Sequence, residues 1–223
     1  IEDQAALSRA VEGADAVFCF AGVTPGGNGP MHRNVSLAKR TLDAANGARV
    51  FLFSSAAVYG ALPGMLPESG AVSPQSDYAR AKLDMETMAA NHTNPCVVLR
   101  LGNVAGADAI LGGWRAGFVL DQFADGQTPA RSYVGPGALA RVLHQLAALD
   151  RLPDVLNVAA PGTVEMGDLL DAATLSWTPR PATERTIAKV HLDTSALEQF
   201  VTFAPHETTA LGIVQDWRNE CSA

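Results

Sequence analysis

Tyr78 is followed one helical turn later by Lys82, and both come after two serines, Ser54 and Ser55, that end an apolar run. In a helix this spacing puts a phenol and an ammonium on the same face. Because a nearby cation favours an ionised phenol, we expect Lys82 to lower the pKa of Tyr78. A serine hydroxyl would complete a site that exchanges a proton with a substrate alcohol while another group carries the hydride. The Tyr-x-x-x-Lys spacing alone is weak evidence, because it also occurs by chance.

Short apolar runs at 16–20, 49–53 and 96–101 alternate with amphipathic segments at 31–46 and 76–91. Such runs are typical of strands buried on both faces of a parallel sheet. The alternation therefore predicts an α/β fold, in which ligands bind beyond the carboxyl ends of the strands. Small or polar residues, which are also ordinary turn residues, occupy these ends: Ala21 and Gly22, Ser54 and Ser55, and Gly102 and Asn103.

The rest of the chain predicts further elements less regularly. A loosely patterned segment, 107–136, suits a small substrate lobe, and 177–190 is rich in Pro and Thr and predicts an irregular segment. A strand is expected at 154–159. Helices are expected at 3–13, 137–150, 166–173, 193–200 and 207–219.

The composition is that of an ordinary globular protein, with 48% hydrophobic and 17% charged residues in 223. A net charge of −7 argues against nucleic-acid and membrane partners. The three cysteines and five histidines are scattered without metal-ligand spacing, so no metal site is expected. The few cysteines fit a reducing compartment, and we expect a cytoplasmic protein.

Five motifs together resemble the extended short-chain dehydrogenase/reductases, the group that contains sugar-nucleotide epimerases and dehydratases. They occur in the order and with the spacing of that family, and the resemblance extends over almost the whole chain. The five motifs are the segments 17–22, 34–45, 53–60, 78–82 and 99–106.

The resemblance implies a role for each matching residue. Tyr78 matches the catalytic acid/base, Lys82 the lysine that contacts the nicotinamide ribose, and Ser55 the residue that hydrogen-bonds the reacting oxygen. Asn103 and Arg131 match positions that contact substrate phosphates. The implied cofactor-binding residues are Phe20, Ala21, Gly22, Asn34, Ser54, Tyr78, Lys82 and Gly102.

The sequence departs from the family pattern at two places. The resemblance places Ile1 just after the third strand of the fold. We therefore expect that the first two strands, the glycine-rich GxxGxxG turn that cradles the cofactor pyrophosphate and the residue that selects NAD or NADP are missing from this sequence. Ala56 and Ala57 stand where the family's 4,6-dehydratases carry Asp and Glu, so an elimination of water would lack its general acid.

These features predict a Rossmann-like, doubly wound parallel sheet, without its first strands, that carries a small C-terminal substrate lobe. We expect a partial dinucleotide-binding domain at 1–106 and the lobe with returning elements at 107–223. The resemblance implies an NAD- or NADP-dependent oxidoreductase or epimerase for a secondary alcohol or carbonyl, with sugars and sugar nucleotides as candidate substrates. A homodimer formed through the Tyr78 helix is a candidate assembly. The alternative is an inactive cofactor-binding or scaffold protein of the same fold.

Overall fold

The computed structural model describes residues 1–221, apart from the side chain of Cys221. The chain forms two compact units. The first comprises residues 1–60, 71–101 and 150–156, and the second comprises 61–70, 102–149 and the chain from residue 157 onward. A functional division at residue 106 stays a prediction.

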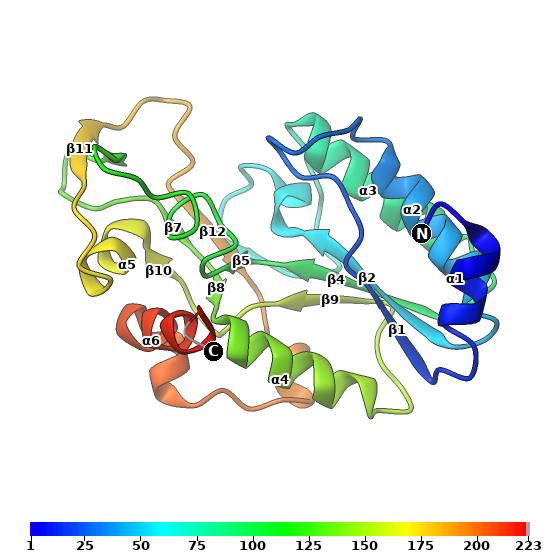
Figure 1. Ribbon diagram of the computed structural model, residues 1–223. Helices are drawn as coiled ribbons and strands as arrows, with labels where there is room; N and C mark the ends of the chain where they lie inside the picture. The colour runs from blue at the N-terminus through cyan, green and yellow to red at the C-terminus, as the bar shows by residue number, and fades with distance from the viewer. Residues whose placement is uncertain (222–223) are drawn as a thin grey trace. The chain divides into compact units, whose positions relative to one another are not determined.

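The first unit is built on a sheet with the strand order β1-β2-β4-β9 (Figure 1). Strands β1 (Ala16–Cys19), β2 (Arg49–Ser55) and β4 (Cys96–Leu101) are mutually parallel, as the apolar runs predict. Strand β9 (Val155–Val158) lies beside β4. The helices of this unit are α1 (Gln4–Ala10), α2 (Arg33–Ala44) and α3 (Asp77–Ala90), and a short 3₁₀ helix, η1 (Ala56–Tyr59), follows β2.

Helices α2 and α3 pack side by side over one face of this sheet (Figure 1). Leu42 of α2 and Met85 of α3 share a buried cluster with Val50 and Leu52 of β2. Burial of these side chains is the main force that holds the helices on the sheet. Helix α3 begins at a capped end, because the Ser76 Oγ accepts a hydrogen bond from the Ala79 N–H at 3.1 Å.

The second unit contains a mixed sheet with the strand order β10-β7-β12-β3 and two short parallel pairs, β5 with β8 and β6 with β11. Its buried core includes Leu169 and Leu170 of α5 with Ile213 and Val214 of α6. The strands are β3 (Met65–Leu66), β5 (Asn103–Val104), β6 (Val119–Gln122), β7 (Ala130–Arg131), β8 (Tyr133–Val134), β10 (Val164–Glu165), β11 (Thr178–Pro181) and β12 (Lys189–Leu192). The helices are α4 (Pro136–Ala147), α5 (Met166–Ala172), α6 (Ala210–Cys221) and the 3₁₀ helices η2 (Leu197–Gln199) and η3 (Pro205–Thr208).

Two sequence predictions in this unit are wrong. The segment 177–190, predicted as irregular, contains β11 and the start of β12. The helix predicted at 193–200 is only the short turn η2. There the Ser195 N–H bonds the Asp193 carboxylate, and the Thr194 hydroxyl bonds Glu198. Such local side-chain bonds compete with helix formation.

The longest helix of the described chain, α3, has 14 residues. None of the helices within residues 1–221 combines the length and the hydropathy that a transmembrane span requires.

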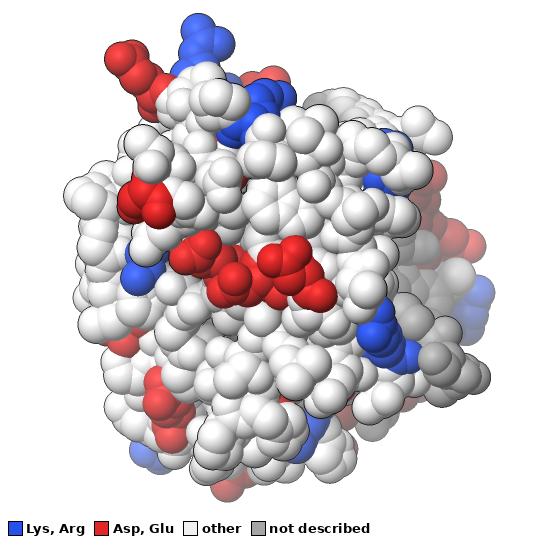
Figure 2. All heavy atoms as spheres, turned by 90° about the vertical axis from the view of Figure 1, so that its left-hand side faces the viewer, with Lys and Arg blue, Asp and Glu red and all other residues white. Residues whose placement is uncertain are grey.

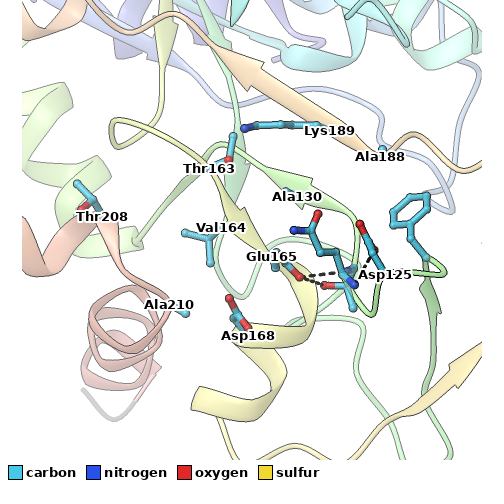
Figure 3. Close-up of a pocket in the computed structure, with 13 residues that line it drawn as sticks. Asp125, Ala130, Thr163, Val164, Glu165, Asp168, Ala188, Lys189, Thr208 and Ala210 are labelled. Atoms are coloured by element: carbon cyan, nitrogen blue, oxygen red, sulfur yellow. Dashed lines mark hydrogen bonds between the residues drawn. The ribbon is translucent and has the colours of Figure 1, made fainter. Parts of the chain in front are cut away.

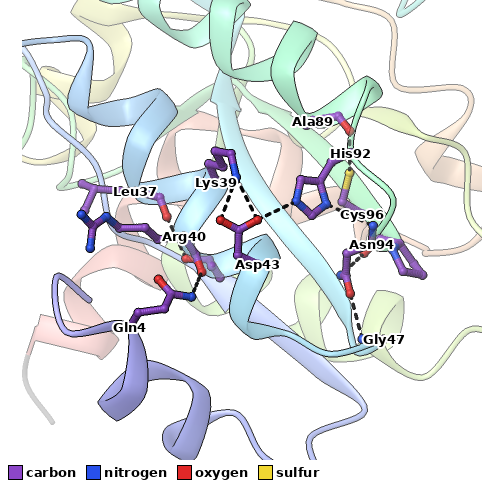
Figure 4. Close-up of polar contacts among 12 residues, drawn as sticks. Gln4, Leu37, Lys39, Arg40, Asp43, Gly47, Ala89, His92, Asn94 and Cys96 are labelled. Atoms are coloured by element: carbon purple, nitrogen blue, oxygen red, sulfur yellow. Dashed lines mark hydrogen bonds and ion pairs between the residues drawn. The ribbon is translucent and has the colours of Figure 1, made fainter.

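The ends of α2 and α3 are tied by a polar cluster around Asp43 (Figure 4). Its carboxylate accepts hydrogen bonds from Lys39 Nζ at 2.8 Å and from His92 Nε2 at 3.0 Å. Because His92 Nδ1 accepts a bond from the Asn94 N–H, its proton lies on Nε2. The bonds from Lys39 and then His92 hold the pKa of Asp43 below its ordinary 3.8.

Asp43→Asn should therefore lower the free energy of unfolding by about 0.5 kcal/mol at pH 7, a small effect because the pair is partly exposed. A carboxyl whose pKa is lowered by folding stabilises above its unfolded pKa and loses that effect as pH falls through its folded pKa. The difference between the parent protein and the variant should thus begin to shrink as pH falls below 3.8, and it should disappear once pH is below the lower folded pKa. Urea unfolding between pH 7 and pH 3 measures it, with Asp84→Asn, an exposed carboxylate of α3, as control. A difference that persists unchanged at low pH would contradict the assignment.

Candidate active site

Ser55, Tyr78 and Lys82 come together in the first unit, where α3 crosses the end of β2. The side chain of Ser55 lies close enough to the Tyr78 phenol to favour its anion and so to lower its pKa. The ammonium of Lys82 is buried, lies 5.8 Å from the centre of the Tyr78 ring, and donates to the main-chain oxygen of Phe53 at 2.7 Å. The three side chains expected from the sequence to act together are therefore neighbours.

The electrostatics differ from the expectation. Burial raises the pKa of Tyr78 above 10.0, and the hydrogen bond from Ser55 offsets this only in part. Burial also lowers the pKa of Lys82, while the nearby Cys19 thiol acts in the opposite direction. In the chain by itself the pKa of Tyr78 is raised rather than lowered, because loss of hydration dominates and Ser55, not Lys82, is the group that favours the phenolate.

Ser54 faces the helix rather than open surface. Its hydroxyl donates to the carboxylate of Glu86, and only 3% of the residue is exposed. The predicted contact of Ser54 with a cofactor can therefore involve only its main chain. Sequence reasoning missed Glu86 and its partner Arg100, although Glu86 follows Lys82 by one further helical turn and so belongs to the same face.

The loop after β1 is held by Asn34. Its amide donates to the main-chain oxygens of Val23 and Met31, each at 3.0 Å, and its Oδ1 accepts from the Val23 N–H at 3.1 Å. Gly22 lies directly beside it, because a Cβ added there would stand 2.7 Å from Asn34 Oδ1 and 3.5 Å from Lys82 Nζ. Asn34 thus fixes the loop, and Gly22 keeps the space next to the Lys82 ammonium free of a side chain.

Phe20 and Ala21 precede this loop at the end of β1. Phe20 is 69% exposed, and its ring stacks on Phe53 with 4.2 Å between the ring centres. Phe18 stacks on Phe51 in the same way at 4.6 Å. An aromatic surface therefore lies at the edge of the sheet, and the cofactor contacts of Phe20 and Ala21 stay predictions.

Gly102 and Asn103 belong to the second unit. A Cβ at Gly102 would lie 2.5 Å from the main-chain oxygen of Ser132, so the glycine is required for the close approach of these segments. The amide of Asn103 is 3.4 Å from the hydroxyl of Tyr133, which donates to Asp108 at 2.7 Å. Burial, then the charge of Asp108, raises the pKa of Tyr133 well above 10.0, so this phenol serves as a fixed donor.

Arg131 is also in the second unit, and its guanidinium is largely committed to main-chain oxygens. It donates to Ala130 at 2.7 Å and to Ile187 at 2.9 Å. A guanidinium has five N–H donors, so others remain for an anionic group. Burial lowers the pKa of Arg131, which an anionic ligand would counteract.

A cavity of about 720 Å³ in the second unit contains none of the predicted site residues (Figure 3). Two of the three carboxylates that line it, Glu165 and Asp125, have local hydrogen-bond partners. Glu165 accepts from the N–H and hydroxyl of Thr128, and Asp125 accepts from the Gln127 N–H. Carboxylates also gather on the face of this unit seen in Figure 2. Burial, and then the charges of Glu165 and Asp171, raise the pKa of Asp168. These contacts explain the local structure without a ligand.

Within residues 1–221, no group of His, Cys, Asp and Glu side chains is arranged to hold a metal ion.

Residues 1–127 match the NAD dependent epimerase/dehydratase family. No curated protein matches the sequence. Solved structures match almost the whole chain but with identities below 25%, so their likeness shows the fold alone, a Rossmann-like α/β fold.

Three of these structures illustrate the likeness. An NAD dependent NDP-hexosamine 5,6-dehydratase involved in tunicamycin biosynthesis is 18% identical, with a TM-score of 0.74, over 95% of this chain and 80% of that one. The dTDP-glucose 4,6-dehydratase from Streptomyces venezuelae, solved with NAD, is 19% identical, with a TM-score of 0.73, over 99% and 78%. The UDP-N-acetylglucosamine 4-epimerase from Methanobrevibacter ruminantium is 23% identical, with a TM-score of 0.71, over 96% and 80%.

The phenol of Tyr78 should titrate above pH 10.0, because burial disfavours its anion. Ser55→Ala should raise the midpoint further, since the hydrogen bond from Ser55 favours the phenolate. The absorbance of tyrosinate at alkaline pH measures this when the curve of a Tyr78→Phe variant is subtracted, within the range where circular dichroism reports a folded chain. A midpoint at or below 10.0, or a lower one in Ser55→Ala, would contradict this electrostatic picture.

Proposed function

Because the chain belongs to the NAD dependent epimerase/dehydratase family, we propose that it is an oxidoreductase or epimerase acting at a secondary alcohol or carbonyl of a sugar or sugar nucleotide. The observation that carries the proposal is the grouping of Ser55, Tyr78 and the buried Lys82, whose ammonium lies 5.8 Å from the centre of the Tyr78 ring and bonds the main chain at the end of β2. The substrate class is supported by the solved relatives, which include complexes with UDP-glucuronic acid and UDP-glucose.

Tyr78 is the proposed acid/base of this reaction. Its phenolate would accept the hydroxyl proton of the alcohol during oxidation, and the phenol would return a proton to the carbonyl oxygen during reduction. Ser55 would hold the reacting oxygen beside Tyr78. Burial raises the pKa of this phenol, so in the chain by itself the protonated form is the one present at neutral pH.

NAD is the cofactor of the family, and when bound it supplies the acceptor and donor of the hydride. The residues present fit its ribose and nicotinamide end. Lys82 offers N–H donors beyond its bond to Phe53, and Gly22 leaves room beside that ammonium. NADP use stays an open alternative.

Elimination of water is not part of the proposal. Ala56 and Ala57 begin the 3₁₀ helix that Ser55 caps, with the Ser55 Oγ accepting from the Ala57 N–H at 3.2 Å. Methyl groups at these two positions cannot transfer a proton to a leaving hydroxyl. Redox chemistry and redox-based epimerisation therefore fit this chain better than the dehydratase reactions of some similar structures.

Two narrower predictions accompany the function. The remaining donors of Arg131, with the amide of Asn103, are proposed to contact an anionic group of the substrate. A homodimer formed through α3 also remains a prediction.

The test combines binding with turnover. We expect calorimetry to detect NAD binding to a full-length protein that includes the expected glycine-rich turn, and a panel of sugar nucleotides and simple secondary alcohols to include a substrate that is oxidised or epimerised. Tyr78→Phe should lower kcat by about 10²- to 10⁴-fold while NAD still binds. Arg80→Gln, an exposed change on the same helix, is the control.

Near-normal turnover by Tyr78→Phe would refute the assignment of the acid/base. Binding of NAD without turnover of any substrate in the parent protein would favour the alternative, a cofactor-binding protein that does not catalyse.

A further inference from the structure

A buried polar network lies directly behind the Ser55, Tyr78 and Lys82 site. Arg100 forms a two-pronged ion pair with Glu86, through Nη2 to Oε2 at 2.7 Å and Nε to Oε1 at 3.1 Å. Its Nη1 donates to the hydroxyl of Tyr59 at 2.9 Å, and Ser54 donates to Glu86. Both side chains of this ion pair are only 8% exposed.

Each member of the network adjoins a site residue along the chain or across the sheet. Ser54 directly precedes Ser55. Arg100 of β4 is paired with Ser54 of β2 in the register of the sheet. Tyr59 ends the 3₁₀ helix that Ser55 caps. Glu86 follows Lys82, which follows Tyr78, each by one turn of α3. The network thus joins the two segments that carry the site, the end of β2 and the buried face of α3.

We propose that Glu86 and Arg100 are positioning residues, which hold the end of β2 against α3 so that Ser55 and Lys82 keep their places beside Tyr78. The inference deepens the proposed function and rests on it. The parallel N–H···O bonds from Arg100 to Glu86 fix the relative orientation of the two side chains as well as the distance between them, and apolar packing does not fix orientation in this way. An apolar pair of similar volume often gives equal or greater stability than a buried ion pair, so stability alone does not account for this one.

Replacing both charges together separates positioning from stability. Glu86→Gln alone should lower the thermal midpoint strongly, because it leaves the Arg100 charge buried without its counter-charge. The double variant Glu86→Leu with Arg100→Met should recover most of that loss. If the pair positions the site, kcat should nevertheless stay about 10-fold or more below the parent value, with KM changed less than about 2-fold.

A second readout does not need activity. In the double variant the Tyr78 phenol should titrate at higher pH than in the parent, because a displaced Ser55 no longer favours the phenolate. The titration is taken against Tyr78→Phe in the same background. The matched control is Glu207→Leu with Arg141→Met, which replaces the two-pronged ion pair of the second unit and should change neither kcat nor the titration.

Recovery of stability, kcat and titration together in the double variant would show a merely structural pair and overturn the proposal. If the double variant does not fold, Ser54→Ala with Tyr59→Phe keeps the ion pair and removes its two hydroxyl bonds. That variant should shift the titration in the same direction, and an unchanged curve would overturn the proposal. Normal turnover by Tyr78→Phe would instead refute the proposed function, while the titration would still report whether the pair positions Ser55.

Discussion

The site depends on how one polar stripe of α3 is matched by the end of β2. Tyr78, Lys82 and Glu86 repeat at one-turn intervals along α3. Their partners on β2 are, in that order, the Ser55 side chain, the Phe53 carbonyl and the Ser54 hydroxyl. Lys82 and Glu86 are both nearly buried. Because an unpaired polar group in such a place is costly, a shift of the helix by one residue would leave these groups without partners. Apolar packing brings the helix onto the sheet, and the polar stripe fixes where along the strand it stops.

The same burial sets the protonation of the site. Loss of hydration acts against the charged form of every ionisable group, and it therefore raises the pKa of Tyr78 and lowers that of Lys82. The phenol and the ammonium are thus both biased toward neutrality by the burial that brings them together. A favourable effect of Lys82 on the phenolate requires the ammonium to lie within about 4–6 Å of the phenolic oxygen. Burial of Tyr78 and Lys82 between helix and strand therefore determines both where the two side chains lie and in which direction their pKa values shift.

The sequence predicted the parts of the molecule that repeat. Apolar runs indicated β1, β2 and β4, and helical spacing placed Tyr78 and Lys82 on one helix, as the structure has them. The strands β11 and β12 were missed because Pro179, Pro181 and several charged residues resemble a loop, and their partners are distant in the chain. The ion pair of Glu86 with Arg100 was missed for a related reason. A single charged residue on a helix is ordinarily solvated, and only the fold puts an arginine of β4 opposite it.

Gly22 and Asn34 illustrate how residues can shape a candidate site through their own contacts. The amide of Asn34 gives both of its N–H donors to the loop after β1, and the cofactor contacts expected of both residues stay predictions. Any side chain at Gly22 would press on the Asn34 oxygen, displace that amide and release the loop. The same side chain would also intrude beside the Lys82 ammonium. Glycine at this position therefore has two effects. It preserves the bonds that shape the loop, and it leaves open the space next to the Lys82 ammonium.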